Sequence, residues 1–248
     1  HCEFCEHGHP NLCSNISFAG HGRTDGALRE YMAWPEKCLF PIPDSFTDAD
    51  GAMLEPLGVA IHTVDLGHLK AGMTVGVFGC GPIGLLIIQV AKLSGAANII
   101  ATDKLPHRVE AAKRFGASQV YSVDNNSRLS EIRAATLGRG VDVAFEAAGV
   151  QDAVDDAVAA VLPGGKIVLA GIPDDDKTSF SASIARRKGL TIKLVRRMKH
   201  TYPRAIEMVS KGLVDVRSIV THRFALEQTD EAFRVAERRD GLKVIINL

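Results

Sequence analysis

The segment TVGVFGCGPIG, residues 74–84, determines which fold we expect for this chain. Its first half, Val75–Phe78, is a short apolar run typical of a buried strand, and residues 82–94 carry the apolar pattern of a helix. Between the two runs, three glycines have the spacing G-x-G-x-x-G. A glycine-rich turn that follows a strand and opens a helix is typical of folds that bind the diphosphate of a dinucleotide.

Each residue of this turn has a physical role. Gly79 permits the tight turn, Gly81 lets a diphosphate approach the backbone, and Gly84 lets the helix pack closely on the strand. Pro82 stands in the first helical turn, where its missing N–H costs nothing. The free amides and the positive dipole end of the helix attract the diphosphate. Glycines also mark ordinary turns, so a doubly wound fold with another ligand, or with none, remains the alternative.

An acidic residue supports the dinucleotide interpretation. Ile99–Thr102 predicts a second buried strand, and Asp103 ends it about 20 residues beyond the glycines, as the motif requires. Asp103 can accept hydrogen bonds from both hydroxyls of the adenosine ribose of NAD, whereas the 2′-phosphate of NADP would meet its negative charge. Lys104 follows and leaves some tolerance of NADP open. The sequence favours NAD.

The remaining segments between 71 and about 195 alternate between strand and helix patterns. We therefore expect an α/β fold whose doubly wound parallel sheet has right-handed crossovers and the six-strand order of the dinucleotide fold. Gly149 and Gly171 follow the fourth and fifth strands and would bring bare backbone to the edge that binds ligand. The expected strands are 73–78, 98–102, 119–122, 141–145, 166–170 and 190–195. The expected helices are 82–94, 105–115, 128–137, 151–161 and 180–188.

Outside this region the pattern changes. Residues 14–57 are punctuated by Pro and Gly, which favours β structure separate from the doubly wound part, although Asp48–Ala60 has a helical pattern. Beyond residue 195 we expect helices near Tyr202–Ser210 and Gln228–Glu237 and a closing strand at Lys243–Asn247.

Composition excludes several classes of partner. The chain has 248 residues with 29 basic and 29 acidic side chains, so charge gives no reason to expect nucleic acid or a membrane surface. A basic cluster within residues 186–204 lacks aromatic interleaving, which favours a solvated face or subunit contact. The apolar run 85–93 is shorter than the roughly 18 residues that a membrane span needs.

Three cysteines near the start have the spacing of metal ligands. Cys2, Cys5 and Cys13 lie in a polar loop, and a C-x-x-C followed by a further Cys is typical of tetrahedral zinc. A closed site needs a fourth ligand, for which His1, His7 and His9 lie nearby. Unligated surface thiols remain the alternative. Five cysteines, three of them clustered, favour a reducing compartment such as the cytoplasm.

Taken together, these segments resemble the zinc-dependent medium-chain dehydrogenases, and within them the polyol branch of sorbitol, xylitol and iditol dehydrogenases. The resemblance covers nearly the whole chain. The glycine turn is common to many folds, whereas the Glu-Pro-Leu and Thr-His-Arg-Phe signatures occur in far fewer proteins. The residues that carry it are Asn11–Cys13, Asp25–Tyr31, Leu54–His62, Gly79–Gly84 and Val220–Phe224.

The resemblance implies a domain organisation. Residues 1–57 correspond to part of a β-rich, GroES-like catalytic domain with the structural-zinc lobe. Residues 58–195 correspond to the NAD-binding Rossmann domain, and residues 196–248 to a C-terminal segment that returns towards the catalytic domain. It also implies a homo-oligomer, either a dimer or a tetramer.

The resemblance also implies the site residues. Cys2, Cys5 and Cys13 correspond to the second, third and fourth ligands of structural zinc, with the first just before His1. Glu55 corresponds to the acid placed near the catalytic zinc and its water or substrate. Dinucleotide contacts are implied for the glycine turn, Ile83, Asp103, Arg108, Ala170, Gly171, Ile172, Val195, Arg196 and Arg197. Arg197 would also point towards the polyol, while Met198 stands where the sorbitol enzymes often carry an aromatic residue.

The largest departure from the family concerns the catalytic zinc. The family holds this metal with a Cys and a His-Glu pair upstream of the structural lobe, and this sequence, which opens at His1 without Met, contains neither. Glu55 alone cannot hold the metal, because a catalytic zinc takes about three protein ligands. We expect a truncated NAD-dependent polyol dehydrogenase that forms a ketose by zinc-assisted hydride transfer and is itself inactive. The alternatives are a non-catalytic dinucleotide-binding module and a threonine-type medium-chain dehydrogenase.

Overall fold

A computed structural model describes residues 2–123 and 128–248 and divides the chain into two compact units. The first consists of residues 1–58 together with 196–248, and the second of residues 59–195. Among the described residues, no helix is long and apolar enough to cross a membrane.

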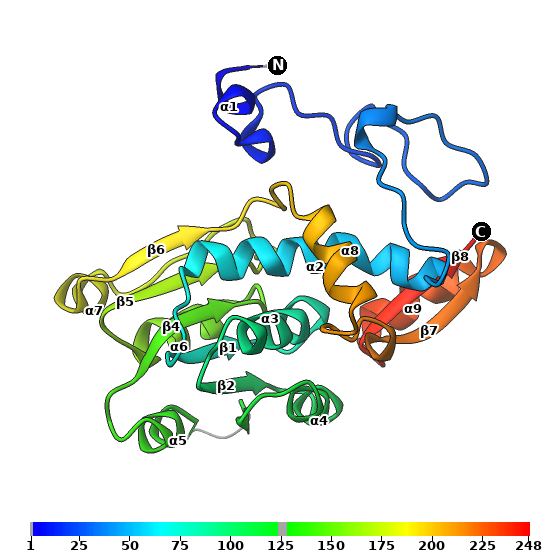
Figure 1. The fold of residues 1–248 in the computed structure, drawn as a ribbon. Coiled ribbons are helices and arrows are strands. Elements are labelled where there is room, and N and C mark those ends of the chain that lie inside the picture. Colours follow the sequence, from blue (N-terminus) through cyan, green and yellow to red (C-terminus); the bar gives the residue numbers. More distant parts are fainter. Residues whose placement is uncertain (1, 124–127) are drawn as a thin grey trace. The chain divides into compact units, whose positions relative to one another are not determined.

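The second unit is built on a parallel sheet, as predicted. Its described residues form six strands in the order β3-β2-β1-β4-β5-β6, which Figure 1 shows as a twisted stack. Strands β1 to β3 are added towards one edge of the sheet and β4 to β6 towards the other, so the ligand-binding switch point of this fold lies between the ends of β1 and β4. The strands are β1 (Thr74–Phe78), β2 (Asn98–Asp103), β3 (Gln119–Ser122), β4 (Val141–Glu146), β5 (Val161–Leu169) and β6 (Thr191–Leu194).

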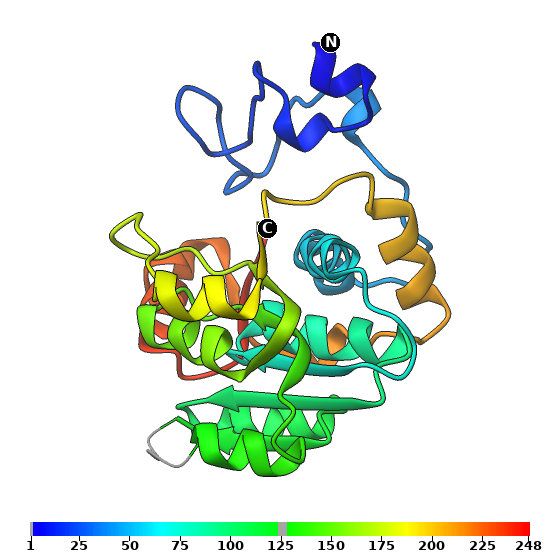
Figure 2. The same cartoon turned by 90° about the vertical axis from the view of Figure 1, so that its left-hand side faces the viewer.

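Helices cover both faces of this sheet because right-handed crossovers in opposite directions lead to opposite faces. Figure 2 shows α3 on one side and α6 and α7 on the other. Each predicted helix of this unit is confirmed, with ends shifted by one or two residues. The helices are α3 (Pro82–Leu93), α4 (Pro106–Arg114), α5 (Arg128–Ala135), α6 (Gln151–Ala160) and α7 (Ala182–Lys188).

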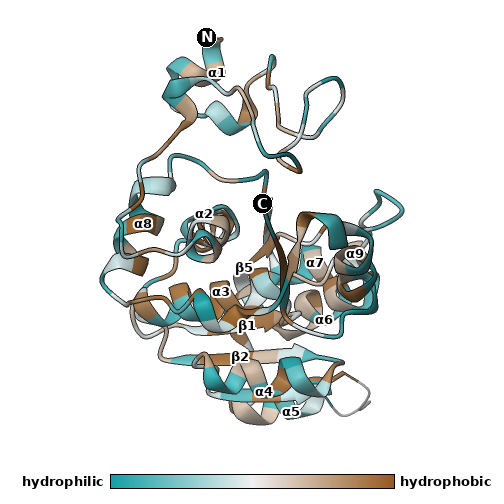
Figure 3. Cartoon of the chain, turned by 90° about the vertical axis from the view of Figure 1, so that its right-hand side faces the viewer, coloured by the Kyte–Doolittle hydropathy of each residue, from teal (hydrophilic) through white to brown (hydrophobic). Residues whose placement is uncertain are grey.

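The core lies between the central strands and their helices, where hydrophobic residues gather (Figure 3). Phe78, Phe145 and Ile167 are almost completely buried. Burying a side chain of this size contributes roughly 1.5–3 kcal/mol. Lys188 caps this core from α7, because its ammonium donates to the carbonyls of Val158, Ala159 and Val161 at 2.7–2.9 Å where α6 ends.

The first unit has less regular structure. A long helix, α2 (Asp48–Gly67), starts here and continues beyond the predicted end at Ala60. The parallel strands β7 (Val220–Ala225) and β8 (Lys243–Asn247) form a small sheet. The other elements are α1 (Glu3–Glu6), η1 (Pro10–Leu12), η2 (Glu36–Cys38), α8 (Tyr202–Ser210), η3 (Arg217–Ile219), η4 (Leu226–Gln228) and α9 (Thr229–Arg238).

The prediction of β structure over residues 14–57 is wrong. All of these residues are described, and none of them is in a strand. Pro35, Pro41 and Pro43 cannot donate to a ladder, and a short strand is stable only when other strands pair with it. By contrast β7, quoted above only as a family signature, is a strand because β8 pairs with it.

Candidate functional site

The glycine turn has the conformation that its sequence demands. Gly79 has φ +101°, and a Cβ there would lie 2.7 Å from the backbone nitrogen of Ala148. A Cβ on Gly84 would collide with the carbonyl oxygen of Gly79. A Cβ on Gly81 would meet only the guanidinium of Arg108, with Nη1 at 3.6 Å. Gly79 and Gly84 are therefore fixed by packing, whereas the surface over Gly81 lies open beneath Arg108.

The helix that follows presents its amides at this turn. Pro82 occupies the first turn of α3, and the amide of Leu85 donates the first intrahelical bond, to the carbonyl of Gly81 at 2.9 Å. The amides of Ile83 and Gly84 precede that bond at the positive end of a twelve-residue helix. These groups favour the negative charge of a diphosphate.

Asp103 is held at the same turn. It ends β2, is 7% exposed, and accepts the amide of Cys80 at 2.7 Å through Oδ2 and the amide of Leu105 at 2.9 Å through Oδ1. The two amides fix the carboxylate but use only part of its acceptor capacity of about four lone pairs. Burial, followed by the charge of Asp103, raises the pKa of the Cys80 thiol, which donates to the carbonyl of Thr102. The open Gly81 surface, the helix amides and the fixed carboxylate together fit a dinucleotide.

Further predicted residues lie at the same carboxyl edge of the sheet. Ala170, Gly171 and Ile172 follow β5, and Ile172 is 85% exposed. Val195 follows β6 and donates its amide to the carbonyl of Leu169 at 2.9 Å. The fold places these residues on the β4–β5–β6 side of the switch point, while Asp103 lies on the β1–β2–β3 side.

Sequence reasoning missed one buried acid at this edge. Glu146 ends β4, is 1% exposed, and accepts the amides of Ala148 and Gly149 at 2.7 Å each. The available signal was an acid that ends a buried strand just before a glycine, the same pattern that identified Asp103.

In the first unit, Glu55 lies half-buried on α2. Burial raises the pKa of its carboxyl group, against the opposing charges of Lys243 and Arg197. Burial and the charge of Glu55 raise the pKa of the Tyr202 phenol, whose ring stacks on Phe40 with centroids 4.8 Å apart. Glu55 is therefore coupled electrostatically to Lys243, Arg197 and Tyr202, as a group of a functional site often is.

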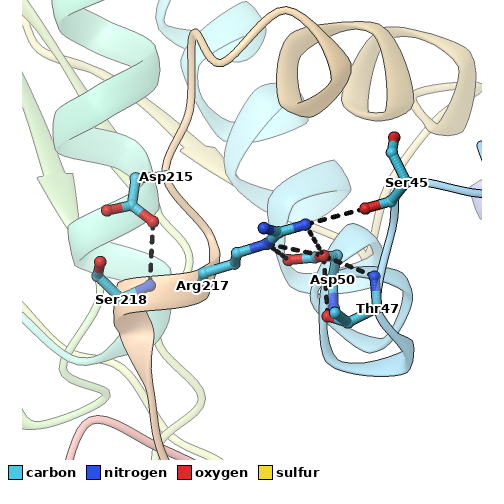
Figure 4. A network of polar contacts seen from close by, with 6 residues as sticks. All are labelled: Ser45, Thr47, Asp50, Asp215, Arg217 and Ser218. Carbon is cyan, nitrogen blue, oxygen red and sulfur yellow. Dashed lines mark hydrogen bonds and ion pairs between the residues drawn. The ribbon is translucent and has the colours of Figure 1, made fainter.

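The start of α2 is anchored by a buried ion pair, shown in Figure 4. Asp50 is fully buried and receives Nε and Nη2 of Arg217 at 2.7–2.9 Å, together with the amide and hydroxyl of Thr47 at 2.8 Å. Nη2 of Arg217 also donates to the carbonyl of Ser45. These bonds fix the first turn of the helix that carries Glu55.

Arg197 belongs to a segment, Arg196–His200, that we call the arginine loop. Its backbone at Arg197 has φ +55°, an unusual value for a residue other than glycine, and its guanidinium lies over the ring of Phe18, 3.4 Å from the centroid. Nη1 of Arg197 is buried without a hydrogen-bond partner among the described residues. A donor of this kind fits a ligand oxygen such as a polyol hydroxyl.

The three predicted cysteines form one cluster. Sγ of Cys2 lies 3.8 Å from Sγ of both Cys5 and Cys13, and all three sulfurs lie within 4.8 Å of one another. Tetrahedral zinc with bonds of about 2.3 Å separates its sulfurs by about 3.8 Å, so the cluster fits this metal. Amides, first that of Cys5 and then that of Ser14, lower the pKa of the Cys2 thiol to about 6.

Neither Glu55 nor the predicted histidines join a metal cluster in the described part of the chain. Across residues 2–123 and 128–248, the three cysteines form the only group of three or more possible ligands. His1 lies outside the described residues, and His9 contacts Lys199, with Nδ1 and Nζ 3.1 Å apart. The described residues therefore do not fit a catalytic zinc.

Comparison with known proteins agrees with this geometry. Residues 82–211 match the family model described as zinc-binding dehydrogenase. The chain is 36% identical over 247 residues to a sorbitol dehydrogenase of Bacillus subtilis, covering 99% of this chain and 70% of that protein. The chain belongs to the zinc-binding dehydrogenase family and is an oxidoreductase of that class.

Two solved structures extend the comparison to the cofactor. A zinc-binding dehydrogenase of Sinorhizobium meliloti bound to NADP superposes with a TM-score of 0.92 at 29% identity, covering all of this chain and 73% of that one. An alcohol dehydrogenase of Escherichia coli complexed with NADH superposes with a TM-score of 0.91 at 29% identity and the same coverage. Both nicotinamide dinucleotides therefore occur among similar structures.

Proposed function

We propose that this chain binds NAD in preference to NADP and serves the oxidation of a secondary alcohol of a polyol to a ketose. In that reaction the carbinol carbon gives a hydride to the nicotinamide and its hydroxyl loses a proton, so NAD becomes NADH. The observation that carries the preference is Asp103, whose carboxylate two amides hold at the glycine turn. A 2′-phosphate at that position would meet this charge. The similarity to a sorbitol dehydrogenase supports a polyol.

Each half of the dinucleotide has a set of groups to receive it. Amides at the start of α3 receive the diphosphate, Asp103 receives the adenosine ribose, and Arg108 adds a positive charge above Gly81. The segments Ala170–Ile172 and Val195–Arg197 receive the nicotinamide half.

The polyol is assigned to the first unit. Arg197 offers a buried Nη1 to a substrate hydroxyl, and Glu55, with its raised pKa, is suited to accept or return a proton. A bound zinc lowers the pKa of an alcohol and favours departure of the hydride. Across residues 2–123 and 128–248, the first unit supplies at most Glu55 as a ligand for that metal. We infer that the 248 residues alone bind the dinucleotide without oxidising a polyol.

Cofactor preference is tested by exchanging charge at the end of β2. Asp103→Ser combined with Lys104→Arg removes the repelling carboxylate and adds a group that pairs with phosphate. The double variant should shift the ratio of NADPH to NADH affinity towards NADPH by about tenfold or more, since each 1.4 kcal/mol is a factor of ten. Fluorescence titration of both cofactors is the measurement. Equal affinities in the unaltered chain would reject the assignment of Asp103.

Substrate and catalysis need a second experiment. Polyol-dependent reduction of NAD should be undetectable with the 248 residues and present in a version extended upstream to include a Cys and a His-Glu pair. In that version Glu55→Ala should lower turnover more than NADH affinity. Sorbitol, xylitol and threonine tested side by side separate a polyol enzyme from a threonine-type one. Zinc-dependent turnover by the 248 residues alone would show that the active site has been misplaced.

The cysteine cluster is proposed as a structural zinc site. With three thiolates the fourth position falls to water or a nearby His, so dialysis against a mild chelator should remove the metal more readily than from the extended version. Full retention of zinc that survives mutation of His1, His7 and His9 would contradict this. Three clustered thiols also fit a reducing compartment such as the cytoplasm.

We also propose a homo-oligomer, a dimer or a tetramer. Strand β6 is an edge strand of the sheet, and Leu194 on it is 73% exposed. Light scattering gives the mass directly, and a monomer at all concentrations would reject the proposal.

A further inference from the structure

The carboxylate of Glu146 organises the loop that follows its own strand. Oε1 accepts the amides of Ala148 and Gly149, both at 2.7 Å. These residues belong to the β4 loop, residues 147–149, in which Gly149 has φ +70°. A carboxylate that accepts two amides holds such a loop in one conformation, because leaving a buried amide unpaired is costly.

Glu146 also holds the neighbouring loop. Its main-chain carbonyl accepts the amides of Ala170 and Gly171 at 2.8 and 3.1 Å, in the β5 loop, residues 170–172. A Cβ on Gly171 would lie 2.5 Å from Oε2 of Glu146, and a Cβ on Gly149 would lie 2.5 Å from the carbonyl oxygen of Ile172. The two loops are therefore packed together around one side chain.

The position of Glu146 in the sheet relates it to the dinucleotide. Glu146 is in register with Phe78, the residue just before Gly79, at the switch point between β1 and β4. The adenosine half belongs with Asp103 on the β2 side, so the β4 and β5 loops face the other half of the ligand. Burial raises the pKa of Glu146, and the amides of Gly149, Ala148 and Gly171 oppose that shift.

We propose that Glu146 is the positioning residue for the nicotinamide half of the dinucleotide site. It holds the β4 and β5 loops in the conformation that receives the nicotinamide. This inference rests on the proposed binding of NAD. The diphosphate side depends less on the carboxylate, because the amide of Ala147 also donates to the carbonyl of Phe78 at 2.8 Å and keeps the chain against Gly79.

The test compares NADH with ADP-ribose, which lacks only the nicotinamide. In Glu146→Gln, Oε1 can still accept two amides, but the new amide nitrogen replaces Oε2, so a charged acceptor beside Gly171 becomes a donor. NADH affinity should fall about tenfold, as expected for one mispaired buried group. ADP-ribose affinity should change by less than about twofold.

Asp142→Asn is the matched control. Asp142 lies four residues earlier on the same strand, and its carboxylate also accepts a backbone amide, that of Thr74 at 2.8 Å. It lies at the opposite end of β4, so the control should change thermal stability while leaving the affinity for both ligands as it was.

The outcomes separate the two proposals. If the unaltered chain binds neither ligand, the proposed function fails, and this inference fails with it. If Glu146→Gln loses NADH and ADP-ribose equally, or binds neither, Glu146 is only structural and the inference is overturned. It is also overturned if the folded variant binds NADH as well as the unaltered chain does. A selective loss of NADH, with a changed NADH emission spectrum, supports it.

Discussion

The glycine turn and the arginine loop are assembled in opposite ways. At the turn, the bond that fixes Asp103 joins it to Cys80, only 23 residues away, and the backbone itself presents the binding groups. In the arginine loop, the carbonyl of Arg196 accepts Nδ2 of Asn11 from 185 positions away, and Lys199 contacts His9 from 190 positions away. The first region is encoded locally, whereas the second exists only when distant segments have come together.

The difference also appears in the backbone. Within residues 79–84 the left-handed conformation falls on Gly79, where it costs little. The arginine loop has such conformations at Arg197 (φ +55°) and His200 (φ +46°), where side chains disfavour them. Conformations of this kind cost about 1–3 kcal/mol each and persist only when the surroundings enforce them. The arginine loop should therefore be the more easily disordered of the two regions.

The largest effect is expected at Gly81. Its backbone (φ −67°, ψ −176°) suits any residue, and a Cβ there meets no atom nearer than 3.6 Å. Gly81→Ala should therefore keep its melting temperature but weaken NADH binding by about a hundredfold, because the methyl group occupies the diphosphate position. Gly51→Ala, in α2, is the control and should keep full affinity. Unchanged NADH affinity in Gly81→Ala would mean that the diphosphate lies elsewhere.

A smaller effect is expected where α2 is anchored. Arg217→Met leaves Asp50 buried without its cation and should lower the free energy of unfolding at pH 7 by about 2 kcal/mol, less than for a fully buried pair because Arg217 is exposed. Burial opposes ionisation of Asp50, but Arg217 and Thr47 outweigh it and lower its pKa. Because folding lowers the pKa of Asp50, its ionised carboxylate stabilises the fold at any pH above about 3.9, the pKa in the unfolded chain. This stabilisation is lost as the pH falls through the pKa in the folded chain.

The difference between the unaltered chain and Arg217→Met should therefore be largest near neutral pH and shrink below about pH 4. Urea unfolding at several pH values measures it. Arg238→Met removes an exposed arginine with two acidic partners and should change stability by less than about 0.5 kcal/mol. A difference that grows on acidification would contradict the assigned role of Asp50.

The smallest effect is expected at Asn11. Asn11→Ala removes the hydrogen bond to Arg196 but also a buried Oδ1 without a partner among the described residues, so the loss should be about 1 kcal/mol. The arginine loop contains trypsin sites at Arg196, Arg197 and Lys199, and cleavage there should become several times faster. Asn15→Ala, an exposed residue of the same segment, is the control. Equal cleavage rates in both variants would show that Asn11 does not restrain the loop.

The same contrast explains what could be predicted from the sequence. The strand order, the glycine turn and the cysteine cluster depend on short spacings, and the structure forms each of them. The prediction for residues 14–57 failed because strand patterns there have no partner to pair with. Glu146 was missed, and Asn11 was quoted only within a family signature, because their importance comes from burial and from contacts that a spacing does not reveal.

The central claim is that this chain is an NAD-binding dehydrogenase unit in which Asp103 selects the cofactor. The most direct test is to titrate the unaltered 248 residues with NADH and with NADPH and to follow nicotinamide fluorescence. We predict saturable binding of NADH, with NADPH bound about tenfold more weakly or worse, since an unpaired charge facing the 2′-phosphate costs at least 1.4 kcal/mol. The absence of saturable NADH binding, or NADPH affinity equal to that for NADH, would contradict the claim.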